Sequence, residues 1–360
     1  MAASSGLVLV TGASGFIASH IVKLLQSQGH KVRGTVRSLA NEDKVKPLYS
    51  LCSDAKHKLE LVEANLNSLE SWDAAVKDCE YVIHVASPFP STSPQDENEI
   101  IRPAVEGTTN VFKACAKAKS VKRIVLTSSC AAIAWEQCPG YNERVRTEKD
   151  WSDTTKIDAY SKSKTLAERA AWDFIKELPA EEKIELAVIN PAFVMGPVLH
   201  GSTGTSQEVV KRLLEKAMPA IPKINFPVVD VRDVAIAHVK AMTLPEAAGN
   251  RHILATDNMY FSDMAHVLKK EFEPQGYNIP TMVAPYFVLW LSSIFDKTVK
   301  MILPQIGLVY KFDNSRMKNV LGIVPHTTTD TLVDMAYTMI ERGFVFKTKK
   351  YRGPPEQKQG

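Results

Sequence analysis

A glycine-rich turn between an apolar run and an amphipathic segment constrains the fold of this chain more than any other feature. The run Leu7-Val-Leu-Val-Thr11 leads directly into Gly12-Ala-Ser-Gly15-Phe-Ile-Ala18, and apolar residues then recur at helical spacing. A glycine turn that joins a strand to a helix presents backbone N–H groups at the helix N-terminus, where they bind a pyrophosphate. The sequence therefore predicts a dinucleotide site at the start of an α/β domain.

The small residues of this turn have separate roles. Gly12 permits the tight turn, Gly15 lets the backbone approach a phosphate, and Ala18 allows close packing of the helix on the strand. The alternative is a glycine turn that binds nothing. The strand before the turn and the helix after it favour nucleotide binding.

Short β-rich runs alternate with longer amphipathic runs through the first half of the chain. The expected strands are Leu7–Thr11, Lys31–Val36, Leu59–Val62, Tyr81–Val85, Arg123–Thr127 and Ile184–Ile189. The expected helices are Phe16–Gln28, Leu69–Val76, Ala104–Ala118 and Tyr160–Glu177. This alternation predicts an α/β fold of the Rossmann type, a doubly wound parallel sheet with helices on both faces.

The pattern changes after Pro191, where Gly, Ser, Thr and Pro residues become frequent. We interpret residues 1–190 as the nucleotide-binding domain and residues 191–345 as mainly a smaller substrate-binding lobe, with segments that return to the first domain. The elements expected in this second part are the helices Val231–Thr243, Phe261–Phe272 and Thr329–Arg342 and the strand His252–Leu254. The last of these helices is expected to return to the main domain, and residues 346–360 form a polar tail.

Composition disfavours several functional classes. The net charge is only +4 and no basic block occurs, which argues against a nucleic-acid partner. The five cysteines are odd in number and lack Cys-x-x-Cys spacing, as expected for reduced thiols in a cytoplasmic protein. No signal peptide is expected, because the N-terminus has no basic stretch before an apolar core. No metal site is expected, since neither a His-Glu-x-x-His motif nor a His/Cys cluster is present.

The apolar segment 285–303 needs separate attention. Its uncharged part, Pro285 to Phe295, is too short to cross a bilayer, and Asp296 and Lys297 end it. A packed helix or a flap over a substrate pocket is the favoured interpretation, ahead of a contact with a membrane surface.

Tyr160 and Lys164 stand four residues apart at the start of an expected helix, so they share one helix face. A lysine ammonium beside a phenol stabilises the phenolate, and we therefore expect it to lower the pKa of Tyr160 enough for acid catalysis near neutrality. Such a pair also occurs by chance on protein surfaces. The segment Thr127-Ser-Ser129 strengthens the case, because hydroxyl groups at the C-terminal end of a parallel strand lie where ligands bind in this type of sheet.

Five motifs together resemble the extended short-chain dehydrogenase/reductases. They are Thr11-Gly-Ala-Ser-Gly-Phe-Ile17, His84-Val-Ala-Ser87, Thr127-Ser-Ser129, Tyr160-Ser-Lys-Ser-Lys164 and Asn190-Pro191. Within that family the chain is similar to the branch of dihydroflavonol reductases, cinnamoyl-CoA reductases and yeast-type methylglyoxal (ketone) reductases. The resemblance covers most of the chain, from Gly6 to about Gly322.

The resemblance implies a catalytic Ser129, Tyr160 and Lys164, with Ser129 favoured over Ser128 because a run of small residues follows it. It implies that Asn110 supports the site. It places Tyr160 and Lys164 at the cofactor as well, with Lys164 on the nicotinamide ribose hydroxyls. The further residues that it places there are Gly12, Ser14, Gly15, Phe16, Ile17, Asn65, Leu66, Val85, Ala86, Ser87, Pro191, Val194 and Ser206. Asn65 departs from the aspartate usual beside the adenine, but its amide oxygen can still accept a hydrogen bond there.

The expected cofactor is NADPH/NADP+. Enzymes that prefer NAD use an acidic residue after the second strand to bind the ribose hydroxyls, and no such residue is present here. Arg37 stands at that strand end instead and Lys44 follows it, as in this branch of the family. A guanidinium suits bidentate contact with a 2′-phosphate.

These features predict an oxidoreductase that reduces the carbonyl of a ketone or aldehyde. The positions expected to contact substrate are Phe89, Ala134 and Pro227. Two of them, Ala134 and Pro227, replace the polar residues with which dihydroflavonol reductases bind their flavonoid, which favours an apolar or aromatic small molecule. Oxidation of the 3β-hydroxysteroid type and a catalytically silent NADP sensor remain alternatives, and the chain is expected to be a monomer or a homodimer.

Overall fold

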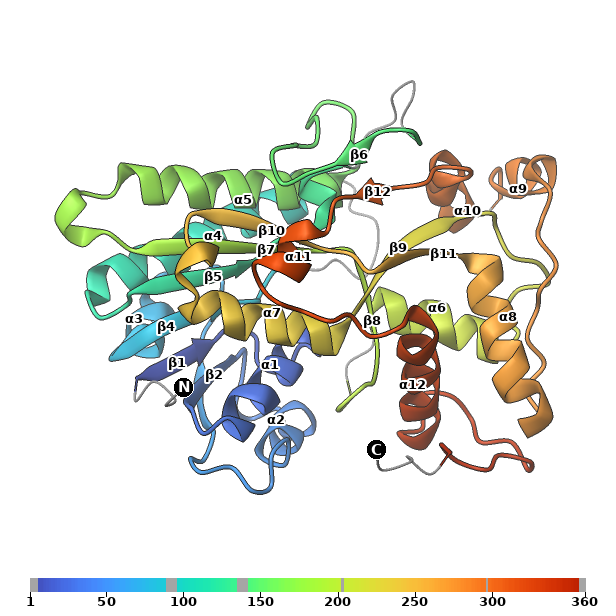
Figure 1. Cartoon of the computed structure of the whole chain (residues 1–360), viewed down its shortest axis with the longest axis horizontal. Helices are drawn as coiled ribbons and strands as arrows, with labels where there is room; N and C mark the ends of the chain where they lie inside the picture. Colours follow the sequence, from blue (N-terminus) through green and yellow to red (C-terminus); the bar gives the residue numbers. More distant parts are fainter. Residues whose placement is uncertain (1–5, 89–95, 135–141, 202–203, 296, 356–360) are drawn as a thin grey trace.

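The computed structural model describes residues 6–88, 96–134, 142–201, 204–295 and 297–355. A seven-stranded parallel sheet in the order β10-β7-β5-β4-β1-β2-β3 is its centre (Figure 1). Its strands are β1 (Leu7–Val10), β2 (Lys31–Val36), β3 (Glu60–Glu63), β4 (Cys79–His84), β5 (Arg123–Thr127), β7 (Glu185–Pro191) and β10 (Asn250–Leu254). The predicted Rossmann-type sheet is thereby confirmed.

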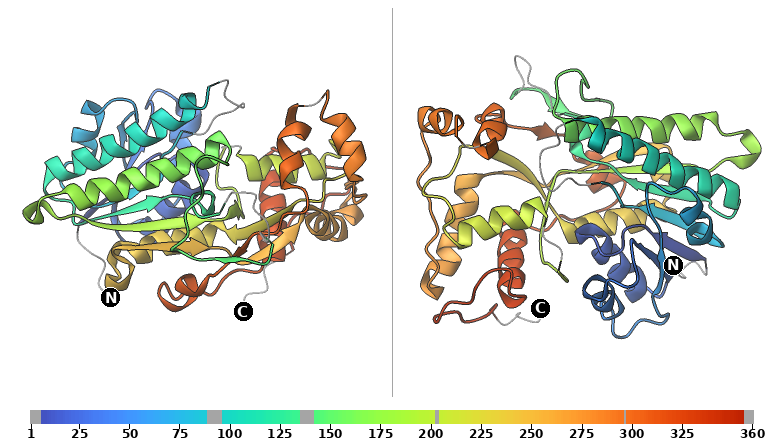
Figure 2. Two further views of the ribbon diagram at one scale, coloured as in Figure 1. Left: turned by 90° about the horizontal axis from the view of Figure 1, so that it is seen from above. Right: turned by 180° about the vertical axis from the view of Figure 1, so that it is seen from behind.

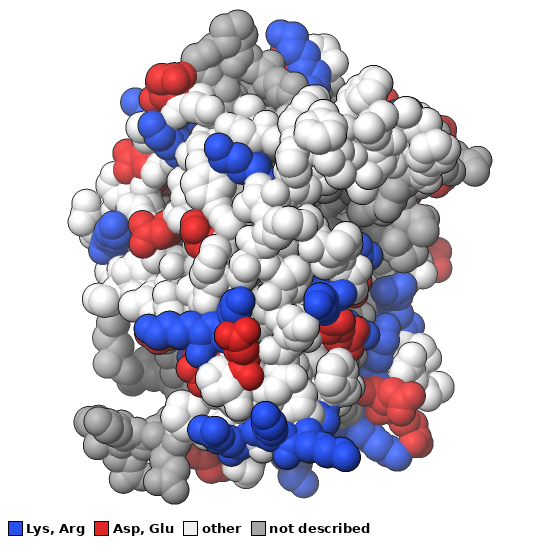
Figure 3. All heavy atoms as spheres, turned by 90° about the vertical axis from the view of Figure 1, so that its right-hand side faces the viewer, with Lys and Arg blue, Asp and Glu red and all other residues white. Residues whose placement is uncertain are grey.

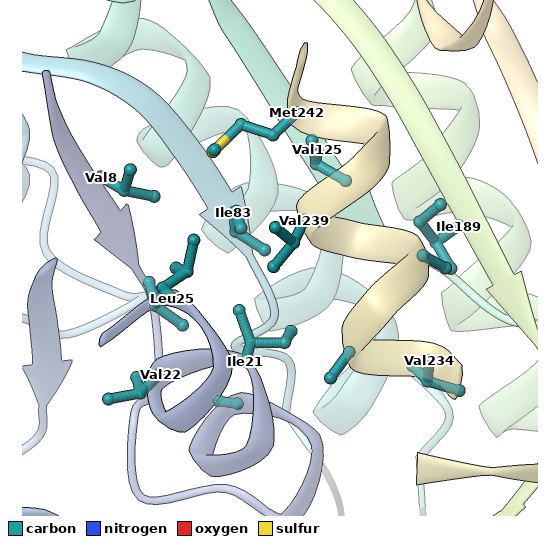
Figure 4. Packing of buried hydrophobic residues seen from close by; sticks show 14 of the residues in the cluster. Val8, Ile21, Val22, Leu25, Ile83, Val125, Ile189, Val234, Val239 and Met242 are labelled. Atoms are coloured by element: carbon teal, nitrogen blue, oxygen red, sulfur yellow. The ribbon is translucent and has the colours of Figure 1, made fainter. Parts of the chain in front are cut away.

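Helices cover both faces of this sheet because its strands are apolar on both sides. The helices of the main domain are α1 (Phe16–Ser27), α2 (Glu42–Tyr49), α3 (Glu70–Val76), α4 (Asn98–Ala118), α5 (Ala159–Glu177) and α7 (Val231–Thr243). On one face, Ile21 and Val22 of α1 and Val239 of α7 pack against Ile83 and Val125 of the sheet (Figure 4). On the other face α3, α4 and α5 pack on the alternate strand residues.

A smaller lobe lies beside the main sheet, at the end toward which β7 runs (Figures 1 and 2). A second sheet in the order β11-β9-β8 forms its base. Its strands are β8 (Phe193–Met195), β9 (Asn225–Asp230) and β11 (Asp257–Tyr260), and its principal helices are α6 (Thr205–Leu214), α8 (Phe261–Phe272) and α12 (Thr328–Glu341). These elements share one apolar cluster, which is separate from the two clusters of the main sheet.

Several shorter elements belong to neither list. They are β6 (Val145–Arg146), which pairs with β12 (Lys311–Phe312), and the helices α9 (Tyr286–Ser292), α10 (Lys297–Ile302) and α11 (Ser315–Asn319). Five 3₁₀ turns complete the described elements, at Cys130–Ala132, Ala180–Glu182, Pro245–Ala247, Glu273–Gln275 and Leu303–Gln305.

Two sequence expectations need correction. The helix Thr328–Glu341 does not return to the main domain, because it packs on α6, α8 and β9 of the smaller lobe. The segments that do return are α7, which packs on α1, and β10, which pairs with β7. The helix predicted from Ala104 begins at Asn98 and contains Pro103 in its second turn.

The apolar segment at α9 is not a packed helix. Leu289 is its one buried residue, whereas Phe287, Trp290 and Phe295 in and after this helix are 63%, 53% and 90% exposed. Figure 3 shows the side of the molecule that lies at the right of Figure 1, and uncharged side chains form a broad area in its upper right part. Whether the segment is a flap stays a prediction. Among the described residues, no helix is long and apolar enough to cross a membrane.

Candidate active site

Two hydrogen bonds to Thr35 of β2 fix the position of the glycine loop after β1. The N–H of Gly12 donates to Thr35 Oγ1 over 2.9 Å, and the N–H of Ala13 donates to the Thr35 carbonyl over 2.9 Å. Gly12 has a φ of +66°, and a Cβ there would lie 3.1 Å from the Cβ of Ala86. Only glycine fits this position without strain.

Helix α1 begins in this loop with an uncapped N-terminus. Gly15 is its N-cap, no side chain accepts a hydrogen bond from its first turn, and that turn contains no acidic residue. The first N–H groups of a helix have no partner within the helix, and the helix dipole makes this end attractive to anions. Phe16 and Ile17 begin α1, and Ser14 lies partly exposed beside them, so the loop offers donors to a pyrophosphate.

Thr11 ties this loop to the segment after β4. Its Oγ1 accepts hydrogen bonds from the N–H groups of Val85, over 3.0 Å, and Ala86, over 2.9 Å. The same oxygen lies 2.8 Å from Nδ1 of His84, so the hydroxyl proton is donated to that nitrogen. Burial lowers the pKa of His84 to about 3, and the ring therefore stays neutral. These bonds place Val85, Ala86 and the partly exposed Ser87 along the glycine loop.

The positive residues in β2 and after it divide into two groups. Arg33 is a structural residue, because its Nε lies 2.9 Å from Glu60 Oε1 and its Nη1 donates to carbonyls at the end of α3. Arg37, directly after β2, and Lys44, in the first turns of α2, are both exposed. These two side chains are accessible to a phosphate.

The segment after β3 is held by helix α4. Asn110 Nδ2 donates to the Leu66 carbonyl over 2.9 Å, and Gly107 lies so close to Leu66 that a Cβ there would be 2.9 Å from the Leu66 Cβ. Oδ1 of the exposed Asn65 accepts from the N–H of Asn67 over 3.0 Å. The supporting role expected of Asn110 is therefore the placement of Leu66.

Ser129, Tyr160 and Lys164 come together at the C-terminal end of β5. Ser129 caps the 3₁₀ turn that follows β5, where its Oγ accepts from the N–H of Ala131 over 3.1 Å. A side-chain hydrogen bond joins Ser129 to Tyr160. Lys164 Nζ lies 5.8 Å from the centroid of the Tyr160 ring. Asp158 caps α5 and thereby fixes the first turn, in which Tyr160 lies.

The expected lowering of the Tyr160 pKa is not observed. Burial raises the pKa of Tyr160 to about 12, and the hydrogen bond from Ser129 opposes this change only in part. Burial also lowers the pKa of Lys164 to about 8. The ammonium lies over the face of the Tyr160 ring, and desolvation dominates the energetics of both groups. The protonated phenol is the form that can donate a proton.

The neighbouring Ser128 has a different partner. Its Oγ donates to Glu168 Oε2 over 2.5 Å inside the protein. Ser129 is thus the serine that contacts Tyr160, and Ser128 belongs to a buried cluster around Glu168 and Arg251.

The remaining predicted cofactor residues lie in or near the connection to the smaller lobe. Pro191 is the buried last residue of β7, Val194 lies partly exposed in β8, and Ser206 is buried in the first turn of α6. Their contact with a cofactor stays a prediction.

Two of the three predicted substrate residues, Ala134 and Pro227, lie among the described residues. Phe89 lies outside the described residues. Ala134 is buried in a small cluster with Cys130 and Ile253, and Pro227 is buried in β9, where it pairs with Asn258 of β11. Their substrate role stays a prediction.

Sequence reasoning missed three residues of this region: Thr35 as the clamp of the glycine loop, and Glu168 and Arg251 as the centre of the buried cluster. Glu168 follows Lys164 by four residues on the same helix face, and this spacing could have identified it. Arg251 is 83 residues further along, and no local pattern marks it. Among the described residues, no group of three or more His, Cys, Asp or Glu side chains could hold a metal ion.

Comparison with known proteins places this geometry among nucleotide-dependent enzymes. A sequence model of the NAD dependent epimerase/dehydratase family matches residues 8–255. A protein of Schizosaccharomyces pombe that is named an uncharacterized oxidoreductase is 34% identical over 96% of this chain and all of its own. A cinnamoyl-CoA reductase of Medicago truncatula is 40% identical over 73% of this chain and 80% of its own.

Solved structures give the same result. The yeast methylglyoxal/isovaleraldehyde reductase Gre2, crystallised with NADPH, is 30% identical. The likeness covers 94% of this chain and all of that one, with a TM-score of 0.79. Gre2 of Candida albicans, also in complex with NADPH, has a TM-score of 0.76 at 30% identity and covers 93% of this chain and 99% of its own.

Proposed function

This chain belongs to the NAD dependent epimerase/dehydratase family, and from that premise we propose that it is an NADPH-dependent reductase of ketone or aldehyde carbonyls. Its relatives support an NAD(P)-dependent oxidoreductase as the coarser statement. The observation that carries the finer proposal is the hydrogen bond between Ser129 and Tyr160, with Lys164 one helical turn further along.

The residues of the nucleotide site fit NADPH. A Cβ on Gly12 would fill the space beside Ala86, and the uncapped N-terminus of α1 presents unpaired N–H donors without an acidic residue nearby. Exposed Arg37 and Lys44 lie where a 2′-phosphate would need positive charge, and two relatives of known structure carry NADPH.

The mechanism follows from the side chains. Bound NADPH supplies the hydride. Ser129 Oγ and the Tyr160 hydroxyl hold the carbonyl oxygen of the substrate, which aligns its carbon and polarises the bond. Tyr160 then donates its proton to that oxygen as negative charge develops. Lys164 orients the ribose hydroxyls and, in its charged form, assists the return of a proton to Tyr160.

The substrate class that we propose is an apolar or aromatic carbonyl compound. The two positions compared with flavonoid-binding residues, Ala134 and Pro227, offer no side-chain donor or acceptor. A site without such groups gains little binding energy from the hydroxyl groups of a flavonoid, so it does not select polyhydroxylated substrates. The names of the relatives mention methylglyoxal, isovaleraldehyde and cinnamoyl-CoA. These three compounds are therefore the first to assay with this protein.

The test is NADPH oxidation, followed by absorbance, with a panel of aromatic and aliphatic ketones and aldehydes and one dihydroflavonol. We expect turnover with NADPH, much slower turnover with NADH, and a loss of at least about a hundredfold in kcat for Tyr160→Phe with unchanged NADPH affinity. Tight NADPH binding without turnover of any carbonyl would refute the proposal and favour steroid-type oxidation or a sensor.

A further inference from the structure

A buried carboxylate, Glu168, is surrounded by donors from two strands, from the segment directly after β5 and from its own helix. It is 1% exposed and lies on α5, one helical turn beyond Lys164 and two beyond Tyr160. Its Oε2 accepts from Ser128 Oγ over 2.5 Å and from Asn190 Nδ2 over 2.8 Å. Its Oε1 accepts from Arg251 Nε over 2.5 Å and from Trp172 Nε1 over 3.3 Å.

Arg251 closes this cluster from the edge strand β10. Its Nη2 reaches Glu168 Oε2 over 3.2 Å, so the pair is bidentate, and its Nη1 donates to the carbonyls of Glu148 and Asp150. The face of Trp151 lies 3.8 Å from the guanidinium carbon. A planar guanidinium suits such a combination of paired and stacked contacts, which a lysine could not reproduce.

The contacts of this cluster converge on Ser129. Asn190 Nδ2, which binds Glu168, also donates to the Ser129 carbonyl over 3.2 Å. Ser128 is the residue immediately before Ser129 and is bound to the same carboxylate oxygen. Glu168 therefore joins the helix that carries Tyr160 to the strand end that carries Ser129.

We propose that Glu168 is a positioning residue, which sets the distance and angle between Ser129 and Tyr160 through Ser128, Asn190 and Arg251. The inference rests on the proposed reductase function. A carboxylate can accept from all of these donors at once, whereas an amide has one accepting oxygen and a nitrogen that must itself donate. Glu168→Gln therefore preserves the shape of the side chain and breaks part of the cluster.

The expected result for Glu168→Gln is a decrease in kcat of about ten- to a hundredfold, because a displacement of about 1 Å at reacting groups costs this much. The KM for NADPH should remain unchanged, because Glu168 lies outside the nucleotide loops. The solvent deuterium isotope effect on kcat should increase, because proton transfer from a misaligned Tyr160 becomes slower than the other steps.

Two further variants complete the experiment. Ser128→Ala removes one contact of Glu168 without touching the ion pair, so it should lower kcat less, in a protein that folds normally. Asp233→Asn is the matched control: this carboxylate is also fully buried and accepts from His326, but it lies on α7. It should lower the Tm and leave kcat per folded molecule unchanged.

The proposal is overturned if Glu168→Gln lowers only the Tm, as the control does, or if its loss of kcat is matched by an equal loss of NADPH affinity. If Glu168→Gln does not fold, Ser128→Ala decides: a normal kcat and isotope effect would refute the inference. If the wild-type protein reduces no carbonyl, the reductase proposal fails instead. The positioning claim is then judged from a crystal structure of Glu168→Gln, in which the hydrogen bond between Ser129 and Tyr160 must be broken.

Discussion

At the scale of single residues, the site combines groups whose chemistry is set by burial. Desolvation keeps Tyr160 protonated and lowers the pKa of Lys164 to about 8. Burial also keeps the ring of His84 neutral beside the Thr11 hydroxyl. Sequence reasoning singled out Ser129, Tyr160 and Lys164, which the fold brings together, and their catalytic roles stay a prediction. It assigned the wrong sign to the change in the Tyr160 pKa. The sign depends on burial, which a sequence motif does not reveal.

Gly12→Ala tests the nucleotide loop. The added methyl group lies 3.1 Å from the Ala86 Cβ and occupies a backbone with a φ of +66°, so we expect NADPH affinity to fall at least about tenfold. Gly343→Ala is the control, since that glycine has a φ of +75° with nothing near its missing Cβ. Fluorescence titration with NADPH measures both variants, and equal affinities for the two would contradict this account.

The pH dependence tests Lys164. Its lowered pKa of about 8 means that the ammonium is present below that pH and is lost as the pH rises through it. We therefore expect kcat/KM for carbonyl reduction to decrease as the pH rises through about 8, with Tyr160 still protonated. The variant Lys164→Met should have a low kcat/KM at every pH, without the decrease near pH 8. A wild-type profile that stays flat up to pH 9.5 would contradict the assignment.

At the scale of elements, the unit β2–α2 places positive charge beside the nucleotide loop. Arg37→Ala combined with Lys44→Ala should raise the Kd for NADPH about a hundredfold and leave that for NADH nearly unchanged, because only NADPH carries the 2′-phosphate. Lys46→Ala is a control on the same helix, where Lys46 pairs with Glu42. An equal loss of affinity for NADPH and NADH would show that Arg37 and Lys44 stabilise the glycine loop and do not bind the 2′-phosphate.

The elements of the first half could be predicted because each strand is a short apolar run with turn residues at both ends. The expected strands agree within about two residues with β1, β2, β3, β4, β5 and β7, whereas the two-residue strand β6 was not predicted. Of the later elements, α7, α8, β10 and α12 could be located but not assigned to a layer, and β8, α6, β9 and β11 were not predicted. The strand expected at His252–Leu254 extends a parallel sheet that begins 240 residues earlier, and only its pairing with Ala187 to Pro191 shows this.

In the candidate site, too, some residues could be predicted from sequence and others could not. Gly12, Ser129 and Tyr160 could be found from sequence, because each lies in a short motif whose residues are close together in the chain. The cluster around Glu168 assembles residues from the segment directly after β5 and from α5, β7 and β10, and contacts between such distant segments leave no periodic signal.

At the scale of the whole molecule, the chain passes repeatedly between its two parts. It leaves the main sheet after β7, returns with α7 and β10, and leaves again for β11. It comes back once more at α11, which packs on β10, before it ends with α12 in the smaller lobe. Neither part is a continuous stretch of sequence.

Expression of residues 1–190 alone tests the unity of this architecture. That fragment lacks α7, which covers one face of the sheet, and β10, which pairs along β7. An exposed apolar face and an unpaired strand edge should cause aggregation. Light scattering and circular dichroism measure this, and a soluble fragment with a cooperative thermal transition would contradict the prediction.

The interleaved chain also limits how such an enzyme can acquire new specificity. Exchange of the smaller lobe with that of a relative cannot be made at one junction, since β8, β9, β11 and α12 are separated in sequence by α7, β10 and α11 of the main domain. Recombination at a single crossover would leave β7 beside a foreign β10 and separate Glu168 from its own Arg251. Divergence in this architecture must therefore proceed by point substitutions and by changes in individual loops, on a framework that is inherited whole.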